Sequence, residues 1–310
     1  PRTPINHGSF NPISVVAPEK SFINARETAP CGGMAEVKFL IDSGVAAAMS
    51  QVVPEMAVGD LKGGANHVHI AGPRDGGGTW IHYEWPAGGT GASAGTDGSN
   101  AVRSYNEGDF NSIQSVETVE QQYPLRVERC EIRTGACGDG EYRGGFGLRR
   151  DLRILDESAM LSVLSEKNVI PPYGVAGGSN AAANRFVVLR GGEAIQPSDV
   201  PGKVSGFALQ QGDIVREETA GGGGYGDPLK RDPARVAEDV REKYLTVEQA
   251  RLRYGVVFDG NGAVDMAATE AVRKDLAADL VNVRLEAANE DDIDGPRRRI
   301  AISKRLAGAL

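Results

Sequence analysis

The feature that most constrains the fold of this chain is a run of four consecutive glycines, Gly221 to Gly224. Each glycine inside a helix or strand costs roughly 0.5–1 kcal/mol of backbone entropy relative to alanine, so such a run belongs where the backbone turns tightly or approaches something closely. Residues 213–216 before the run are predicted to form a strand, and Asp232-Pro233 after it is typical of a helix start. We therefore predict the order strand, glycine loop, helix, with a positive φ at one or two of the four glycines.

A glycine loop between a strand and a helix can hold an anion with its backbone N–H groups. This run is not followed by the lysine and the serine or threonine of a phosphate-binding loop, and it does not have GxGxxG spacing. A rigid joint between a β-rich body and a helical tail is the simpler alternative.

Composition places the chain among ordinary soluble domains, because 40% of its 310 residues are hydrophobic and 25% are charged. The net charge of −8 argues against a nucleic-acid or anionic-membrane partner. No apolar run approaches the roughly 20 residues that span a bilayer. The three cysteines, Cys31, Cys130 and Cys137, are odd in number and scattered, which predicts a reducing, cytoplasmic location.

The pattern of elements predicts an α+β fold with a β-rich centre, sandwich-like or barrel-like, and helices at both ends. Short alternating segments separated by turn residues fill residues 125–216. We expect three regions. Residues 1–122 form a mixed α/β segment with a histidine hairpin and a glycine loop, residues 123–230 a β-rich domain, and residues 231–310 a helical region with a small hairpin.

Residues 34–53 are predicted to form a helix that ends at Pro54. Its apolar residues recur every three or four positions, as on a core-facing stripe. They are Met34, Val37, Leu40, Ile41, Val45 and Met49. Gly44 within this helix predicts close packing against a neighbour.

Three of the four histidines fall in one predicted hairpin, residues 66–85. His67 and His69 are two apart and share one face of a strand, while His82 and Glu84 follow on the partner strand. Such a face could bind a divalent metal or supply an acid or base near neutral pH. The alternative is a polar sheet face with satisfied imidazoles. The candidate catalytic residues are His69, His82 and Glu84.

A second glycine-rich loop follows this hairpin. Gly88, Gly89, Gly91 and Asp97 are candidate substrate-binding residues, because a backbone nest there could hold an anionic intermediate. A purely structural turn is the alternative. Cys31 stands at a predicted helix start, where the helix dipole could lower its pKa, although a small buried thiol is the simpler interpretation.

Several stretches resemble hydantoinase B subunits, a family that includes 5-oxoprolinase halves, caprolactamase and acetone or acetophenone carboxylase subunits. They are GSFNPISVVAPEKSFINA, EWPAGGTGASAGTDG, SIQSVETVEQQYPLRVERCEIRTGACGDGEYRGGFGLRRDLRIL and TAGGGGYGDPLKRDPARVAEDVREKYLTVEQARLRYGVVFD. They keep the family's order from Pro4 to about Asp265. The match covers the C-terminal half of these longer proteins, so the chain is expected to be a split subunit or a fragment.

The resemblance implies a subunit, or the C-terminal half of a subunit, of an ATP-dependent cyclic-amide hydrolase of the hydantoinase B/oxoprolinase type. A subunit of an ATP-dependent acetone or acetophenone carboxylase is one alternative, and a non-catalytic interface fragment is another. The expected partners are an ATP-binding subunit of the hydantoinase A type and the N-terminal half of the B-type subunit.

The resemblance also implies that ATP and a divalent metal act in the complex without being bound by this chain. Family members place their metal ligands in a histidine- and aspartate-rich segment of the N-terminal half, so no metal ligand is assigned here. The predicted helix over residues 34–53 and the β core are expected to pack partly against another polypeptide.

Overall fold

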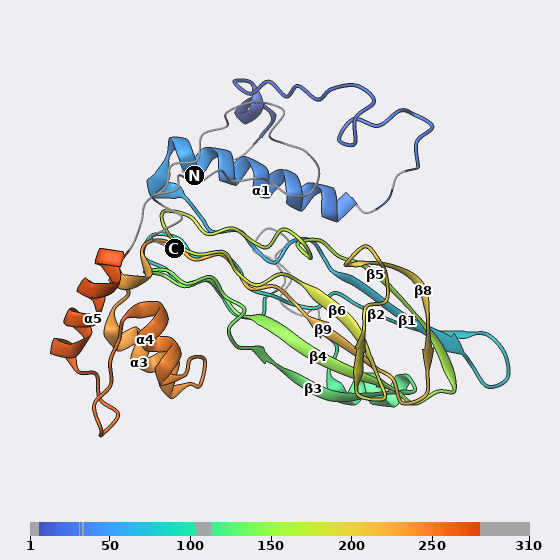
Figure 1. Ribbon diagram of the computed structural model, residues 1–310. Helices are drawn as coiled ribbons and strands as arrows, with labels where there is room; N and C mark the ends of the chain where they lie inside the picture. The colour runs from blue at the N-terminus through green and yellow to red at the C-terminus, as the bar shows by residue number, and fades with distance from the viewer. Residues whose placement is uncertain (1–5, 31, 33, 103–112, 280–310) are drawn as a thin grey trace, which may run out of the picture. The chain divides into compact units, whose positions relative to one another are not determined.

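The computed structural model describes residues 6–30, 32, 34–102 and 113–279 (Figure 1). Contacts within the chain group residues 1–273 into one compact unit and residues 274–310 into another. Two antiparallel sheets dominate the first unit, with strand orders β2-β1-β5-β8 and β3-β4-β9-β6-β7.

The strands are short and follow the predicted alternation. They are β1 (His67–Pro73), β2 (Thr79–Glu84), β3 (Leu125–Arg133), β4 (Gly147–Ile154), β5 (Ser158–Leu164), β6 (Arg185–Arg190), β7 (Glu193–Ile195), β8 (Lys203–Gln210) and β9 (Ile214–Glu218). The α-helices are α1 (Met34–Val52), α2 (Val116–Gln122), α3 (Pro233–Arg241), α4 (Val247–Tyr254) and α5 (Met266–Asp279), and short 3-10 turns cover His7–Phe10, Pro54–Met56 and Pro228–Lys230.

Both sheets contribute to one hydrophobic core, so the β-rich centre is a sandwich. Val68, Ile70 and Leu161 come from the first sheet, and Leu152 and Val215 from the second. Each sheet is open, with edge strands β2 and β8 in one and β3 and β7 in the other, so neither closes into a barrel. The predicted α+β class is confirmed.

The first sheet joins strands from both sides of the expected boundary at residues 122 and 123. Strands β1 and β2 precede it, and β5 and β8 follow it. The division into three regions stays a prediction, and the β-rich centre includes the histidine hairpin.

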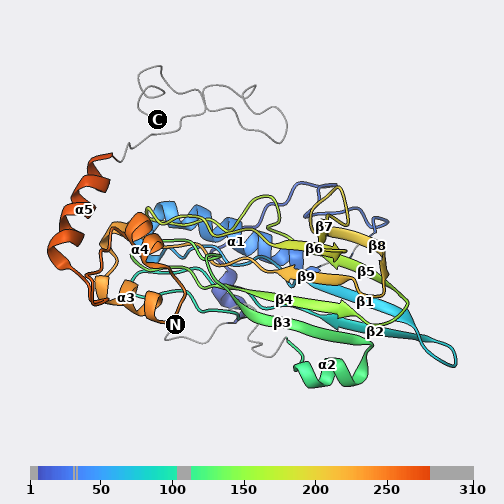
Figure 2. The same cartoon turned by 60° about the horizontal axis from the view of Figure 1, so that its bottom comes forward.

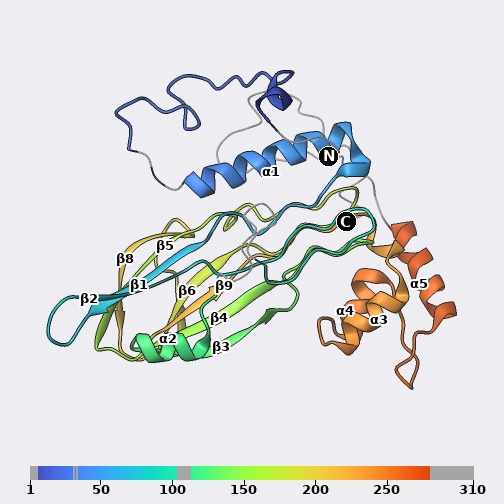
Figure 3. The same ribbon diagram turned by 180° about the vertical axis from the view of Figure 1, so that it is seen from behind.

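The apolar stripe of α1 faces outward, contrary to the prediction that it packs in the core. Leu40, Ile41, Val45 and Met49 are 44%, 47%, 58% and 51% exposed. The helix lies alongside the body of the protein (Figure 3) through other side chains, including buried Phe39. The expected close packing at Gly44 is also wrong, because nothing lies within 4 Å of where its Cβ would stand.

Hydrogen bonds fix the buried side of α1. Ser43 Oγ donates to Asp60 Oδ1 at 2.8 Å, and the Ser43 carbonyl accepts from the Tyr173 hydroxyl at 2.8 Å. The helix therefore meets the protein body through Phe39 and the hydrogen bonds of Ser43, while the large apolar side chains of its stripe face outward.

Next to the sandwich lies a layer of extended, glycine-rich segments, here called the glycine layer. It comprises residues 59–62, 88–91, 138–145, 173–179 and 220–226, which run side by side. Successive N–H groups of the tetraglycine donate to different segments. Gly222 N donates to the Gly145 carbonyl at 2.9 Å, and Gly223 N donates to the Asp60 carbonyl at 2.8 Å. Only glycine fits such crowded positions, as at the axis of a collagen triple helix.

The tetraglycine serves close approach and not a turn. A Cβ on Gly222 would stand 1.8 Å from the Thr90 carbonyl oxygen. None of the four glycines has a left-handed φ, and the nearest one that does is Gly226, with φ of 75°. The predicted positive φ within the run is therefore wrong, whereas the predicted close packing is confirmed.

The predicted helix signals after the glycine layer are confirmed. Asp232 caps α3, accepting from Ala234 N at 2.9 Å. Thr246 and Gln249 form both bonds of a capping box at the start of α4, which ends at Gly255 with φ of 64°. Helices α3 and α4 pack together on a small core of their own (Figure 2). Among the described residues, no helix has the length and apolar character needed to cross a bilayer.

Candidate functional site

The hairpin of β1 and β2 carries polar residues on both faces, and its register separates them. His69 pairs with Tyr83, while Ile70 pairs with His82. His67 and His69 therefore lie on the outer face of the sheet, and His82 and Glu84 point into the sandwich. The expected single face with three histidines and a carboxylate is wrong.

The outer face holds a cluster of five residues, here called the outer histidine cluster: Glu36, His67, His69, Tyr83 and Trp85. His67 Nε2 lies 2.7 Å from Glu36 Oε1 on α1. His67 Nδ1 accepts from Trp85 Nε1 at 2.8 Å and also contacts the Tyr83 hydroxyl. The ring of His69 stacks on Tyr83 with centroids 4.1 Å apart.

Electrostatics favour a neutral His69. Its partial burial, followed by the neighbouring His67, lowers the pKa of His69 below the ordinary value of 6.5. A neutral imidazole on a half-exposed sheet face can accept a proton near pH 7.

The inner face contributes to a second set of residues, here called the inner charged cluster: His82, Glu84, Arg150 and Glu217. Arg150 Nη1 lies 3.2 Å from Glu84 Oε2, and His82 Nε2 lies 3.6 Å from the same oxygen. Burial, followed by the charge of Glu84, raises the pKa of Glu217 well above its ordinary value of 4.5. Glu217 therefore keeps its proton to a higher pH than an ordinary glutamate does.

The inner charged cluster is enclosed by the sandwich. His82 is fully buried, and its ring contacts the edge of Tyr123 at a centroid distance of 5.1 Å. Neither ring nitrogen of His82 has a hydrogen-bond partner among the described residues. The catalytic roles predicted for His82 and Glu84 stay predictions, and the structure separates both residues from His69.

The predicted substrate-binding glycines belong to the glycine layer. Gly88 N donates to the Val102 carbonyl at 2.9 Å, and Gly89 N donates to the Ala220 carbonyl at 3.0 Å. Gly91 packs against Gly59. These two N–H groups are engaged by the backbone, and the substrate-binding role of the loop stays a prediction.

Asp97 takes part in an ion-pair network. Its carboxylate accepts from both terminal nitrogens of buried Arg231, at 2.7 Å and 2.9 Å. It also accepts from Arg143 N at 2.9 Å. Burial opposes ionisation, but Arg231 and then Arg143 hold the pKa of Asp97 below its ordinary value. Arg231 also binds Asp239 of α3 at 2.9 Å, so Asp97 links the glycine layer to the helical region.

Sequence reasoning missed several charged residues on α1 and in the segments next to it. Glu36 and Glu166 flank Gly64, whose Cβ would stand 3.3 Å from Glu36 Cγ and 3.1 Å from Glu166 Oε2. Burial raises the pKa of Glu166, and Glu36 adds to the rise. Nearby, Lys167 forms an ion pair with Asp60. No local pattern marks these residues, because 130 positions separate the two glutamates.

The two cysteines in the described part of the chain are free thiols. Burial raises the pKa of Cys137 to about 12, so it stays a thiol. Cys130 is exposed. Cys31 lies outside the described residues. Among the residues that the structure describes, no group of three or more histidine, cysteine, aspartate or glutamate side chains is placed to hold a metal ion.

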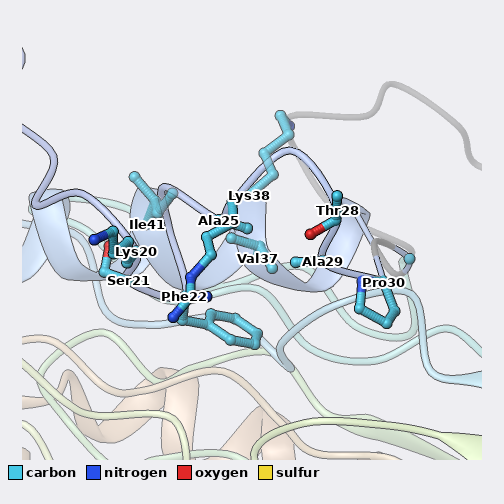
Figure 4. A pocket seen from close by; sticks show the side chains of 12 residues that line it. Lys20, Ser21, Phe22, Ala25, Thr28, Ala29, Pro30, Val37, Lys38 and Ile41 are labelled. Atoms are coloured by element: carbon cyan, nitrogen blue, oxygen red, sulfur yellow. The ribbon is translucent and has the colours of Figure 1, made fainter.

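A cavity of about 1040 Å³ lies between residues 20–30 and α1 (Figure 4). Phe22, Pro30, Val37 and Ile41 supply apolar walls, and Lys38 stands at its edge. None of the predicted site residues lines it. The cavity lies against the same helix whose large apolar side chains face outward.

A model of the family described as hydantoinase B/oxoprolinase matches residues 1–228. The chain belongs to this family. It is 33% identical to an uncharacterised protein of Methanocaldococcus jannaschii, over 88% of this chain and 47% of that protein. It is also 33% identical to the caprolactamase subunit beta of Pseudomonas jessenii, over 87% of this chain and 48% of the relative.

Solved structures agree with this hydantoinase B/oxoprolinase membership. The crystal structure of the ATP-dependent caprolactamase from Pseudomonas jessenii matches 84% of this chain and 46% of that chain, with 30% identity and a TM-score of 0.71. An acetone carboxylase in its nucleotide-free form matches 71% of this chain and 34% of that chain, with 24% identity and a TM-score of 0.57, which shows a shared fold. The chain spans about half the length of the curated relatives named above.

Proposed function

We propose that this chain is a subunit, or the C-terminal half of a subunit, of an ATP-dependent cyclic-amide hydrolase. The observation that carries the proposal is 33% identity to a caprolactamase subunit beta across 87% of the chain. The likeness to the acetone carboxylase is one of fold, so cyclic-amide hydrolysis is the better supported reaction.

The proposed enzyme works as a complex in the cytoplasm. An ATP-binding partner of the hydantoinase A type would supply the nucleotide, and a polypeptide equivalent to the other half of the relatives would hold the divalent metal. The exposed apolar side chains of the N-terminal part support contact with such a polypeptide. They are Phe10, Ile13, Val15, Val16, Phe22, Ile23, Leu40, Ile41, Val45, Met49, Val52 and Met56.

The outer histidine cluster has the access that proton transfer requires. His69 is half-buried on the outer sheet face, and its lowered pKa favours the neutral base. His82 and Glu84 lie behind it in the sandwich. We assign them the task of fixing β2, the strand that presents Tyr83 on its other face.

The test is reconstitution of the complex from this chain, the A-type subunit and the polypeptide equivalent to the other half. The complex is assayed with ATP and caprolactam, hydantoin or 5-oxoproline, and in parallel with ATP, bicarbonate and acetone. We expect ring opening of at least one cyclic amide, coupled to ATP consumption. Carboxylation of acetone without ring opening would overturn the proposal.

Variants separate a catalytic role from an interface role. His69→Ala is expected to lower kcat at least tenfold while the complex stays assembled. Ser162→Ala is the matched control, because Ser162 pairs with His69 across β1 and β5 and lies on the same face. If both variants keep full activity, His69 does not act in the reaction, and the interface alternative is favoured.

A further inference from the structure

The hydrogen bonds around His67 define its tautomer. Trp85 Nε1 is only a donor, so His67 Nδ1, 2.8 Å away, must accept. The ring proton of neutral His67 then sits on Nε2, which lies 2.7 Å from Glu36 Oε1. Glu36 is only 4% exposed, and its carboxylate forms a close ion-pair contact with the Nε2 edge of the imidazole, although neither of its oxygens has the geometry of a hydrogen bond to a described residue. This buried negative charge holds the ring edge that lies opposite Nδ1.

Tyr83 is the remaining residue in contact with the His67 ring nitrogen and Trp85. Its hydroxyl contacts His67 Nδ1 and also Trp85 Nε1. Nδ1 has a single lone pair, so it accepts either from the indole N–H or from the hydroxyl. When the hydroxyl turns its hydrogen to Nδ1, the indole N–H donates to the phenol oxygen instead. A hydroxyl beside a base that a carboxylate orients is the arrangement of an activated nucleophile or proton donor.

We propose that Tyr83 is a catalytic proton-transfer residue, with His67 as its base and Glu36 as the positioning residue. The assignment rests on the proposed cyclic-amide hydrolysis. When the hydroxyl proton leaves, the Trp85 N–H stabilises the phenolate oxygen, and Glu36 stabilises the imidazolium if the proton moves to His67. Both charge-assisted contacts are strongest in the charge-separated state, which is what catalysis requires.

The strand register supplies a binding surface beside Tyr83. On the outer face, Tyr83 and His69 form one row, and Ile81, Ala71 and Met160 form the next row across β2, β1 and β5. Ile81 and Met160 are each 56% exposed. An apolar row next to a polar row fits a small ring that has methylene groups on one side and an amide on the other.

In the proposed step, Tyr83 donates a proton to the leaving nitrogen of the ring. The Tyr83 O–H bond breaks as an N–H bond forms on the departing ring nitrogen, which takes the electron pair of the breaking carbon–nitrogen bond. The water that hydrolysis consumes adds its hydroxyl to the carbonyl carbon. Its remaining proton returns to the Tyr83 oxygen through His67 Nδ1.

The first test uses Tyr83→Phe in the reconstituted complex. General acid–base catalysis contributes typically 10²–10⁴-fold, so we expect kcat to fall about 10²-fold or more with KM within about twofold. Tyr225→Phe is the matched control, because Tyr225 also loses one hydroxyl but lies in the glycine layer against Tyr142. Near-normal kcat in Tyr83→Phe would overturn the assignment. An inactive wild-type complex would count against the proposed function instead.

The second test needs no activity and guards against misfolded variants. The chain has four histidines, so nitrogen chemical shifts of their side chains can be assigned. We expect His67 to show a protonated Nε2 and an accepting Nδ1, and Glu36→Gln to shift its Nε2 signal. The opposite tautomer would overturn the arrangement. In the complex, Glu36→Gln is expected to lower kcat about tenfold and leave KM within twofold, and an unchanged kcat would remove Glu36 from the proposal.

Discussion

Gly91 lies against Gly59 so closely that a Cβ on residue 91 would stand 1.6 Å from the Gly59 carbonyl oxygen. Real Cβ contacts of this kind do not occur, so the backbone of one segment must move if a side chain is added. The same holds for Gly222 against Thr90, at 1.8 Å. These contacts make the glycine layer a rigid body between the sandwich and α3, and close approach accounts for the tetraglycine.

The first prediction concerns this packing. Gly91→Ala is expected to lower the free energy of unfolding by about 3 kcal/mol or more, because overpacking forces a backbone shift. Gly260→Ala is the control, since nothing lies within 4 Å of its Cβ position and its φ is not left-handed. Urea denaturation of the two variants measures the difference. Equal stabilities would contradict the close packing.

The second prediction concerns acid stability through Asp97. Its folded pKa lies below the ordinary 3.8, so its ion pair with Arg231 stabilises the fold at neutral pH, and this contribution is lost as pH falls below 3.8 through the folded pKa. Asp97→Asn is therefore expected to cost about 2 kcal/mol at pH 7. The difference in the free energy of unfolding between the wild type and Asp97→Asn should shrink in acid. If this difference stays constant down to pH 2, the charge of Asp97 contributes nothing to the stability of the fold.

The third prediction concerns Glu217, which titrates in the opposite sense. Its folded pKa is raised above the ordinary 4.5, so the folded state holds a proton that the unfolded chain releases above pH 4.5. Stability then declines as pH rises from 4.5 toward the folded pKa. Glu217→Gln keeps the neutral side chain and removes this decline, so its stability relative to wild type should increase from pH 5 to pH 8. A variant that is less stable at pH 8 would mean that Glu217 is ionised beside Arg150.

Local signals in the sequence were sufficient for the helix starts and the β-rich centre, but they did not decide between a sandwich and a barrel. Asp232-Pro233 and the pair Thr246 and Gln249 act within four residues, so the signal and the cap that it forms lie in the same short segment. The periodicity of α1 predicted a helix correctly but assigned the wrong environment to its apolar stripe. The same period suits a core and an interface, and the contacts of Ser43 and Phe39 decide which face is buried.

The candidate site depended on relationships that no local pattern contains. Whether His82 shares a face with His69 depends on the register of β1 and β2, which pairs Ile70 with His82. Glu36 meets His67 only because α1 lies beside the start of β1, and the two residues are 31 positions apart. Sequence reasoning could therefore find the hairpin but not the cluster that forms on it.

The most direct test of the proposed function is product formation with and without this chain. The A-type subunit and the polypeptide equivalent to the other half are assayed with ATP and the cyclic amide that the complete complex opens. We predict that ring-opened product forms, in step with ADP, only when this chain is present. Equal product formation in its absence would contradict the account, because the chemistry would then reside wholly in the other subunits.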